Sequence, residues 1–234
     1  MNILIIGEGA REKSLTWKLK KSSLCRKIIT GNKGIYFNTQ KEKIDLKDIA
    51  SLKKLAVEAK LNKVDLVICG PEDPLALGAE EFFTKENIPF WGPSKNAAKL
   101  ESSKSFAKEL MNAAGVPTAP YVLVRDKYQL QSIAKQKFIE WGGVVLKADG
   151  LAGGKGVFIS RCEKELNEHL KILEEEKFQN STSKILIEKI MIGRECSHFS
   201  MIAQGSSLES LGFAVDFKRR YENDQGLNTG GMGA

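Results

Sequence analysis

Residues 144–159 read VVLKADGLAGGKGVFI. The apolar runs at 144–146 and 157–159 predict two strands, and the glycine-rich stretch between them predicts a turn. Glycine lets the backbone approach a ligand closely, and consecutive backbone N–H groups can bind an anion. Two interpretations fit this stretch alone. It is either a loop that closes over nucleotide phosphates with Lys147 and Lys155 as cations, or a long hairpin turn with solvated lysines.

The stretch differs from the P-loop of kinases and GTPases. That motif reads G-x-x-x-x-G-K-[ST] and runs from a strand into a helix. Here Lys155 is followed by Gly156 and then by residues typical of a strand. No helix N-terminus is offered to a phosphate, so a nucleotide would be held by a hairpin. P-loop enzymes are therefore disfavoured.

Length and composition are ordinary for a soluble globular protein. The 234 residues suit one large domain or two small ones, with 42% hydrophobic and 28% charged residues. Residues 1–6 have no basic region and reach glycine at once, so they predict a first buried strand rather than a signal peptide. No run of about 18 apolar residues suggests a membrane span. We expect a cytoplasmic protein.

The charge and the cysteines restrict the possible ligands. A net charge of +7 attracts nucleic acids and phosphorylated small molecules alike. The lysines are spread along the chain and no segment interleaves arginine with aromatic residues, so nucleic-acid binding is the weaker interpretation. The four cysteines form no C-x-x-C pair, and with two histidines they indicate no zinc site.

Strands and helices alternate over the N-terminal part of the chain. Apolar runs at residues 2–6 and 64–69 predict strands buried on both faces. Helices are predicted over residues 11–20, 49–61 and 76–87. Such alternation predicts an α/β fold with a doubly wound parallel sheet.

Two loops follow these strands at their carboxyl ends, where ligands bind in open α/β sheets. Residues 7–12 (GEGARE) open a helix, so a single phosphate fits there; a tight turn without a ligand fits too. A dinucleotide is disfavoured because position 12 is glutamate instead of glycine. Residues 70–75 (GPEDPL) offer Glu72, either as an acceptor for ribose hydroxyls or as a helix-start acid.

The C-terminal part of the chain mixes strands and helices without strict alternation. A helix is predicted over residues 96–114, and strands at 121–124 and 185–190. The tail, residues 216–234, is polar and glycine-rich and has no predicted strand or helix. A terminal glycine loop has nothing to pack on, so we expect the chain to be a fragment that ends within a domain.

Six segments occur in an order and spacing that resemble one known family. They are residues 7–12, 70–75, 103–106, 146–156, 187–195 and 228–234. The family is phosphoribosylamine–glycine ligase (glycinamide ribonucleotide synthetase), a group of ATP-grasp enzymes. The resemblance implies an N-terminal pre-ATP-grasp sheet domain over residues 1–101. It also implies an incomplete α+β ATP-grasp domain, made of a partial central domain at 102–121 and 192–234 and a lid subdomain at 122–191.

The resemblance also implies an activity in de novo purine (IMP) biosynthesis. ATP would phosphorylate the carboxylate of glycine, and the amine of 5-phosphoribosylamine would attack the resulting glycyl phosphate. The products would be glycinamide ribonucleotide, ADP and phosphate. Implied cofactors are ATP and Mg²⁺ or Mn²⁺. Implied partners are these small molecules, with no nucleic acid and no membrane, and the full-length form would be a monomer.

Site residues follow from the resemblance, position by position. It implies ATP contacts at Lys104, Lys147, Gly153, Gly154, Lys155, Gly156, Glu188, Lys189, Met191 and Glu195. It implies substrate contacts at Gly9, Ala10, Arg11, Glu72, Asn228, Thr229, Gly230 and Gly231. It implies catalytic roles for Asp216, Lys218 and Arg219. No metal ligand is implied within the chain.

The chain departs from the family at three positions and in length. The family usually has glycine at Ala10, histidine at Lys13, and histidine or tyrosine at Phe217, which puts fine contacts to phosphoribosylamine in question. Its members are nearly twice as long, and their metal ligands lie in the part without a counterpart here. Little activity is therefore expected of the chain alone. Two alternatives stay open: another ATP-grasp carboxylate–amine ligase, or an ATP- and phosphoribosyl-binding fragment without turnover.

Overall fold

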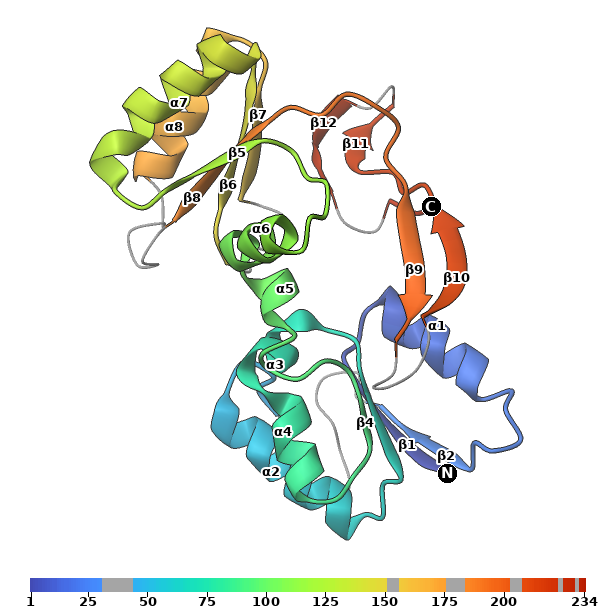
Figure 1. Cartoon of the computed structure of the whole chain (residues 1–234). Coiled ribbons are helices and arrows are strands. Elements are labelled where there is room, and N and C mark those ends of the chain that lie inside the picture. Colours follow the sequence, from blue (N-terminus) through green and yellow to red (C-terminus); the bar gives the residue numbers. More distant parts are fainter. Residues whose placement is uncertain (31–43, 151–155, 176–183, 203–207, 223–224, 230–231) are drawn as a thin grey trace. The chain divides into compact units, whose positions relative to one another are not determined.

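The computed structural model in Figure 1 describes most of the chain. The described residues are 1–30, 44–150, 156–175, 184–202, 208–222, 225–229 and 232–234. They divide into two compact units, Met1–Leu110 and Met111–Ala234. Within the described ranges, no helix is both long and apolar enough to cross a membrane. The division into three parts that the resemblance implies stays a prediction.

The first unit is built on a parallel sheet with the strand order β2-β1-β3-β4. Its strands are β1 (Asn2–Ile6), β2 (Lys27–Ile29), β3 (Leu66–Cys69) and β4 (Phe90–Trp91). Every neighbouring pair is parallel. The four apolar residues of β1 that follow Asn2 are buried, as expected for a strand covered on both faces.

Helices cover both faces of this sheet. Those of the unit are α1 (Ala10–Leu19), α2 (Ile49–Leu61), α3 (Glu72–Leu77), α4 (Ala79–Lys85), α5 (Lys99–Ser102) and the start of α6 (Lys104–Ala113). Ile3 and Ile5 face a core that includes Leu15 of α1. Leu4 shares the opposite core with Phe83 of α4. The predicted doubly wound parallel sheet is therefore confirmed.

Two predicted helices are each broken into two. The helix predicted over 76–87 starts earlier, at Glu72, and is interrupted at Gly78, whose φ of +94° belongs to the left-handed region. The helix predicted over 96–114 is interrupted at Ser103, which is extended. The Ser103 hydroxyl accepts a hydrogen bond from the backbone N–H of Phe106 at 3.2 Å, as an N-cap of α6 does.

The second unit contains a four-stranded sheet with the order β5-β8-β6-β7, and every pair in it is antiparallel. Its elements are β5 (Tyr121–Val124), α7 (Lys127–Trp141), β6 (Val144–Ala148), β7 (Val157–Ser160), α8 (Glu163–Glu175) and β8 (Ile185–Lys189). The two strands predicted at 144–146 and 157–159 are confirmed, because Leu146 pairs with Phe158 across β6 and β7; most of the predicted turn lies outside the described residues.

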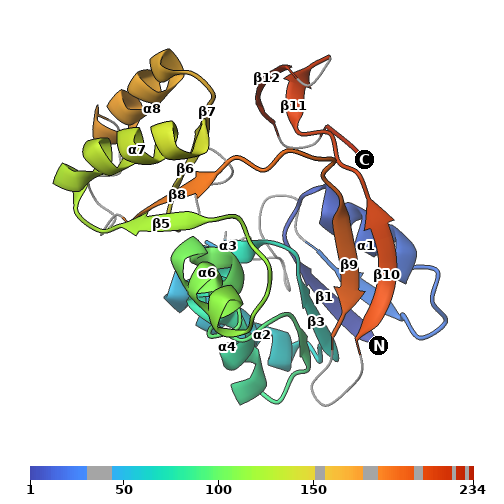
Figure 2. The same cartoon turned by 45° about the horizontal axis from the view of Figure 1, so that its top comes forward.

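Both helices of this sheet lie on the same face, as Figures 1 and 2 show. Leu130 of α7 and Leu170 of α8 share a core with Leu146 and Ile187 of the sheet. Side chains alternate between the two faces of a strand. The neighbours of Leu146 and Ile187 therefore point to the face opposite α7 and α8.

Two hairpins complete the second unit. One pairs β9 (Ser197–Met201) with β10 (Glu209–Ala214), and the other pairs β11 (Arg219–Tyr221) with β12 (Gln225–Asn228). The expectation that the tail contains no strand is therefore wrong. The tail lacks apolar alternation, so its pairing is carried by backbone groups, which leave no pattern in the sequence.

A buried serine–histidine contact joins β7 to α8. The fully buried Ser160 hydroxyl lies 2.9 Å from Nδ1 of His169, whose ring also packs against Phe158. Burial lowers the pKa of His169 below its ordinary value of 6.5, although the Glu165 and Glu168 carboxylates oppose the shift. Protonation of this ring is therefore disfavoured in the folded state.

We expect the second unit to lose stability as the pH falls below 6.5. The folded pKa of His169 is lowered, so the unfolded chain binds more protons in the window between the folded pKa and 6.5. The contribution of the neutral His169 ring to the free energy of unfolding is complete above pH 6.5 and is lost as the pH falls through that window. Thermal unfolding between pH 7.5 and 5 would measure it. In His169→Asn, which cannot titrate there, the drop should shrink; an unchanged drop would contradict the assignment.

Candidate active site

The loops that follow β1 and β3 start side by side. The two strands are adjacent and parallel, and Ile6 pairs with Cys69 at their carboxyl ends. Gly9 is the N-cap of α1, and Ala10 is its first residue. Glu72 is the first residue of α3.

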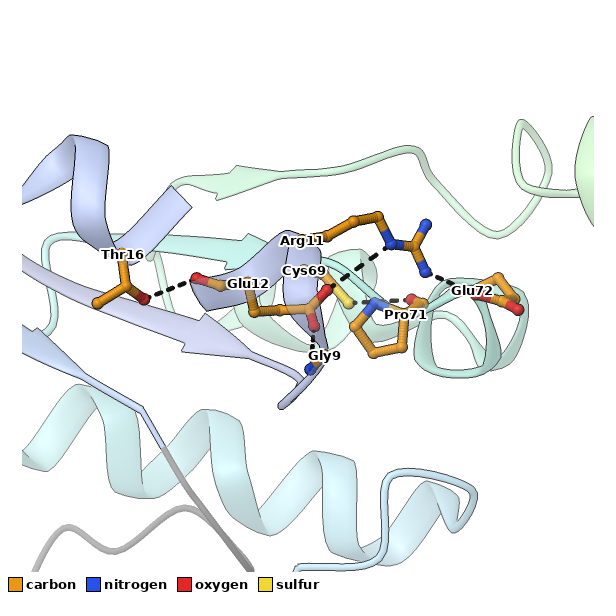
Figure 3. Close-up of polar contacts among 7 residues, drawn as sticks. All are labelled: Gly9, Arg11, Glu12, Thr16, Cys69, Pro71 and Glu72. Atoms are coloured by element: carbon orange, nitrogen blue, oxygen red, sulfur yellow. Dashed lines mark hydrogen bonds and ion pairs between the residues drawn. The ribbon is translucent and has the colours of Figure 1, made fainter. Parts of the chain in front are cut away.

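Arg11 connects these two loops. Its Nη2 lies 3.5 Å from Oε2 of Glu72, and both side chains reach solvent (Figure 3). The structure therefore brings together Gly9, Arg11 and Glu72, three of the residues predicted to bind substrate. A cation beside a carboxylate at this edge can bind an anionic group and hydroxyl or amine donors of one ligand.

Glu12 belongs to the same cluster. In the sequence it stood out only as the glutamate that replaces a glycine of the dinucleotide-binding motif. The residue is 5% exposed, and its Oε2 accepts a hydrogen bond from the backbone N–H of Gly9 (Figure 3). This is one half of a capping box: the side chain three positions after the N-cap binds the N-cap backbone N–H, and glycine has no side chain to return the bond. A phosphate at the start of α1 would thus find the Gly9 N–H already engaged and would have to use Arg11 or other groups.

Glycines make room for the Glu12 side chain. A Cβ at Gly70 would lie 1.8 Å from Oε1 of Glu12, and a Cβ at Gly9 would lie 2.8 Å from Oε2. A Cβ at Gly7, whose φ is +110°, would lie 2.9 Å from the Glu12 carboxyl carbon. The glycines of the GEGARE and GPEDPL motifs therefore surround a carboxylate of the protein itself.

Cys69 is the last residue of β3 and lies close to Glu12, Arg11 and Glu72. Its thiol donates to the backbone oxygen of Pro71 at 3.4 Å (Figure 3). Burial, and next the negative charge of Glu12, raise the pKa of Cys69 to about 12. The group is therefore a neutral thiol at physiological pH.

We expect Cys69 to resist alkylation while the protein is folded. With a pKa of about 12, its thiolate fraction at pH 8 is on the order of one in ten thousand, and the thiolate is the nucleophile. Cys162 and Cys196 are exposed and should react with iodoacetamide first. Mass spectrometry of peptides would follow each site, and Cys69 should become labelled in urea. Labelling of folded Cys69 as fast as Cys162 would contradict the expectation.

In the second unit, Lys147 of β6 and Glu188 of β8 form an ion pair. Lys147 Nζ lies 2.6 Å from Glu188 Oε2, on the face of the sheet opposite α7 and α8. The Glu188 side chain is 7% exposed and that of Lys147 is 27% exposed. Two residues predicted to contact ATP are thus brought together, and the carboxylate is the more deeply buried partner.

Only part of the predicted lid loop belongs to the described residues. Gly153, Gly154 and Lys155 lie outside the described residues. Gly156 is buried, and its carbonyl accepts a hydrogen bond from the Ala148 N–H at 3.0 Å, which extends the β6–β7 ladder. Lys104, the other predicted phosphate ligand, is the first residue of α6 in the first unit and is half-buried.

The segment after β8 is exposed. Lys189 ends the strand, and its backbone N–H donates to the Pro120 carbonyl at 2.9 Å. Met191 is 74% exposed. Glu195 contacts Lys218, with Oε2 at 3.3 Å from Nζ. The structure therefore joins Glu195, the predicted ribose ligand, to one of the predicted catalytic residues.

Lys218 lies between two carboxylates. Its Nζ donates to Oδ2 of Asp216 at 2.9 Å, in addition to the contact with Glu195. The hydrogen bond to Asp216, together with that to Glu195, raises the pKa of Lys218 above its ordinary value. The same ammonium lowers the pKa of Asp216. Both groups therefore keep their charges at neutral pH.

The β11–β12 hairpin gathers the remaining predicted residues. Arg219 pairs with Asn228 across the hairpin, and the Thr229 N–H donates to the Lys218 carbonyl at 2.7 Å. Gly230 and Gly231 lie outside the described residues. Backbone pairing thus places the predicted catalytic residues beside the predicted substrate loop.

Comparison with protein families accounts for the whole chain. Residues 1–101 match the model described as phosphoribosylglycinamide synthetase, N domain, and residues 102–234 match the ATP-grasp (A) domain of the same enzyme. The chain belongs to the phosphoribosylglycinamide synthetase family. The resemblance inferred from the motifs is therefore confirmed.

The chain is also similar to individual proteins of the phosphoribosylglycinamide synthetase family. The chain is 38% identical over 236 residues to phosphoribosylamine–glycine ligase of Mesorhizobium japonicum, a match that covers 100% of this chain and 54% of the relative. The chain thus spans about half the length of the curated relatives it matches. The solved phosphoribosylamine–glycine ligase of Thermotoga maritima has a TM-score of 0.67 at 22% identity, covering 98% of this chain and 54% of that one.

A second solved structure extends the fold match beyond the phosphoribosylglycinamide synthetase family. N5-carboxyaminoimidazole synthetase from Staphylococcus aureus, complexed with ADP, has a TM-score of 0.62 at 18% identity and covers 91% of this chain and 53% of that one. The predicted ATP-grasp fold class is confirmed.

A divalent metal is expected for the phosphoribosylglycinamide synthetase family. Among the residues that the structure describes, no group of three or more histidine, cysteine, aspartate or glutamate side chains could hold one. The side chains of these described residues therefore do not form a metal centre.

Proposed function

We propose that the chain serves the ATP-dependent ligation of glycine to 5-phosphoribosylamine in de novo purine biosynthesis. The observation that carries the proposal is the match of all 234 residues to two consecutive domains of one enzyme family. The clusters at Arg11, Lys147 and Lys218 support it, because each combines the charges that such substrates need.

The proposed reaction has two steps. A carboxylate oxygen of glycine attacks the γ-phosphorus of ATP, the bond to the bridging oxygen breaks, and ADP leaves. The amine nitrogen of phosphoribosylamine then attacks the carbonyl carbon of glycyl phosphate, which expels phosphate and releases a proton from nitrogen. Both steps need cations on phosphate oxygens and protection of the acyl phosphate from water.

We assign the nucleotide to residues of the second unit; the resemblance names Lys104 as a further phosphate ligand. Lys147 would bind phosphate oxygens, and Gly153, Gly154, Lys155 and Gly156 would contact the same phosphates. Glu188, Lys189 and Met191 would border the base, and Glu195 would accept hydrogen bonds from ribose hydroxyls.

We assign phosphoribosylamine to the edge of the first sheet. Arg11 would bind its phosphate, and Glu72 would accept hydrogen bonds from hydroxyl or amine groups, beside Gly9 and Ala10.

Acyl transfer would take place near the β11–β12 hairpin. The charged Lys218 and Arg219 would stabilise negative charge that develops on the acyl phosphate, with Asp216 holding Lys218. Asn228, Thr229, Gly230 and Gly231 would line the substrate loop.

We also propose the partners, cofactors, oligomeric form and location of the enzyme. Small molecules, and not nucleic acid or a membrane, are its proposed partners, with ATP and Mg²⁺ or Mn²⁺ as cofactors. Its proposed form is a monomer in the cytoplasm.

Calorimetry with ATP and a glycine-dependent ADP-release assay test the proposal together. We expect ATP to bind the wild-type chain. Absence of ATP binding would overturn the proposal. Binding with release of ADP that requires both glycine and phosphoribosylamine would establish the full reaction. Binding without turnover would leave the chain the role of a nucleotide- and phosphoribosyl-binding module.

A further inference from the structure

We propose that Glu12 is a positioning residue for substrate binding: its buried carboxylate holds the Gly9 turn and aims the Arg11 guanidinium at Glu72. The assignment of a ligand to this edge of the sheet rests on the proposed function. The positioning itself rests on contacts among residues of the first unit alone (Figure 3).

The two oxygens of the Glu12 carboxylate have different tasks. Oε2 accepts the Gly9 N–H and completes the cap of α1. Oε1 is buried and has no hydrogen-bond partner among the described residues, but it lies 4.0 Å from Nε of Arg11. A cap requires one oxygen only, so the second carries a contact that capping does not explain.

Arg11 is held at both ends of its guanidinium group. Nε faces Glu12 and Nη2 faces Glu72, at 4.0 and 3.5 Å. Because the guanidinium is planar and rigid, the buried Glu12 carboxylate at Nε directs its other end, Nη2, towards Glu72. The Arg11 side chain is otherwise 73% exposed, and an exposed arginine would sample many rotamers.

Packing prevents the carboxylate from moving elsewhere. The side chain of Glu12 is 7% exposed, and Gly70 leaves it a space that any Cβ would occupy. A buried carboxylate is costly unless a donor or cation compensates it, and Arg11 is the cation beside Oε1. Glu12 and Arg11 therefore restrain each other before a ligand arrives.

Glu12→Gln separates the two tasks. The amide oxygen of glutamine can still accept the Gly9 N–H, while the amide nitrogen replaces the oxygen that faces Arg11 with a donor. Glu81→Gln is the matched control, since Glu81 also accepts a backbone N–H (Lys95, 2.8 Å) and keeps a buried Oε2 without a hydrogen bond in the described residues. Glu81 makes no contact with the Arg11 cluster in the described contacts.

Ribose 5-phosphate is the probe, with binding to the 234-residue chain followed by calorimetry. We expect Glu12→Gln to weaken binding about tenfold, because a misaimed guanidinium loses its contact with phosphate. Glu81→Gln should bind as the wild type does. The ¹⁵N relaxation of the Arg11 Nε–H group gives a readout without ligand, and we expect its mobility to rise in Glu12→Gln.

The outcomes separate this inference from the proposed function. Equal affinity of wild type and Glu12→Gln would overturn the positioning role. If the wild type does not bind ribose 5-phosphate, the substrate assignment at this edge is wrong. In that case the mobility of Arg11 decides the positioning role: a rise in Glu12→Gln supports it, and unchanged mobility overturns it.

Discussion

Gly70→Ala is expected to lower the free energy of unfolding of the first unit by about 2–4 kcal/mol. The new Cβ would lie 1.8 Å from Oε1 and 2.6 Å from Cδ of Glu12. Gly70 does not have a positive φ, so the backbone tolerates alanine and the cost is steric. Glu12 cannot turn away without losing the Gly9 N–H. Hydrogen-exchange protection of the β1 amides reports on this unit specifically.

A double-mutant cycle tests the cause. Glu12→Ala alone loses the cap and should cost about 1 kcal/mol. In that background the carboxylate is gone, so Gly70→Ala should cost less than about 1 kcal/mol. If the two changes are additive instead, the clash with Glu12 is not the reason that glycine is needed at position 70.

Lys147→Met is expected to have two separable effects. The first is on stability: it removes the ammonium that lies 2.6 Å from the buried Glu188 carboxylate, which costs roughly 1–3 kcal/mol of unfolding free energy in the second unit. The second is on ligand binding: loss of a charged contact to phosphate should weaken ATP about 10- to 100-fold. Thermal unfolding and calorimetry measure the two effects.

A second variant distinguishes the two effects. Lys147→Met combined with Glu188→Gln removes both charges, so much of the stability should return while ATP binding stays weak. Lys164→Met is the control for a lost positive charge, because Lys164 is exposed on α8, which packs on the other face of the sheet. Full ATP affinity in Lys147→Met would show that the ion pair serves structure only.

Local sequence patterns predicted much of the fold, because the strands and turns concerned depend on residues that are close together in the chain. The apolar run of residues 2–6 predicted β1 and its burial on both faces. The glycines between residues 146 and 157 predicted the β6–β7 hairpin. The strands of the tail were missed, since β11 and β12 pair through backbone groups and lack the apolar alternation that identifies a strand.

The motifs predicted most residues of the candidate site but not the contacts between them. The motifs selected Arg11 and Glu72, and Lys147 and Glu188, but did not show that either pair is in contact. Glu12 was not selected at all, because the glycine at position 9 lacks the hydroxyl with which a capping-box pattern begins in a sequence.

The sequence by itself determined the alternation of strands and helices in the first unit, the strands of the β6–β7 pair and the family. Those features depend on neighbouring residues, whose periodicity and turn chemistry are visible in one dimension. Only the tertiary structure decided which charges meet. Lys147 and Glu188 are 41 residues apart, and Arg11 and Glu72 are 61 apart. Strand register and the packing of α1 bring them together, and the same packing buries Glu12 against Gly70.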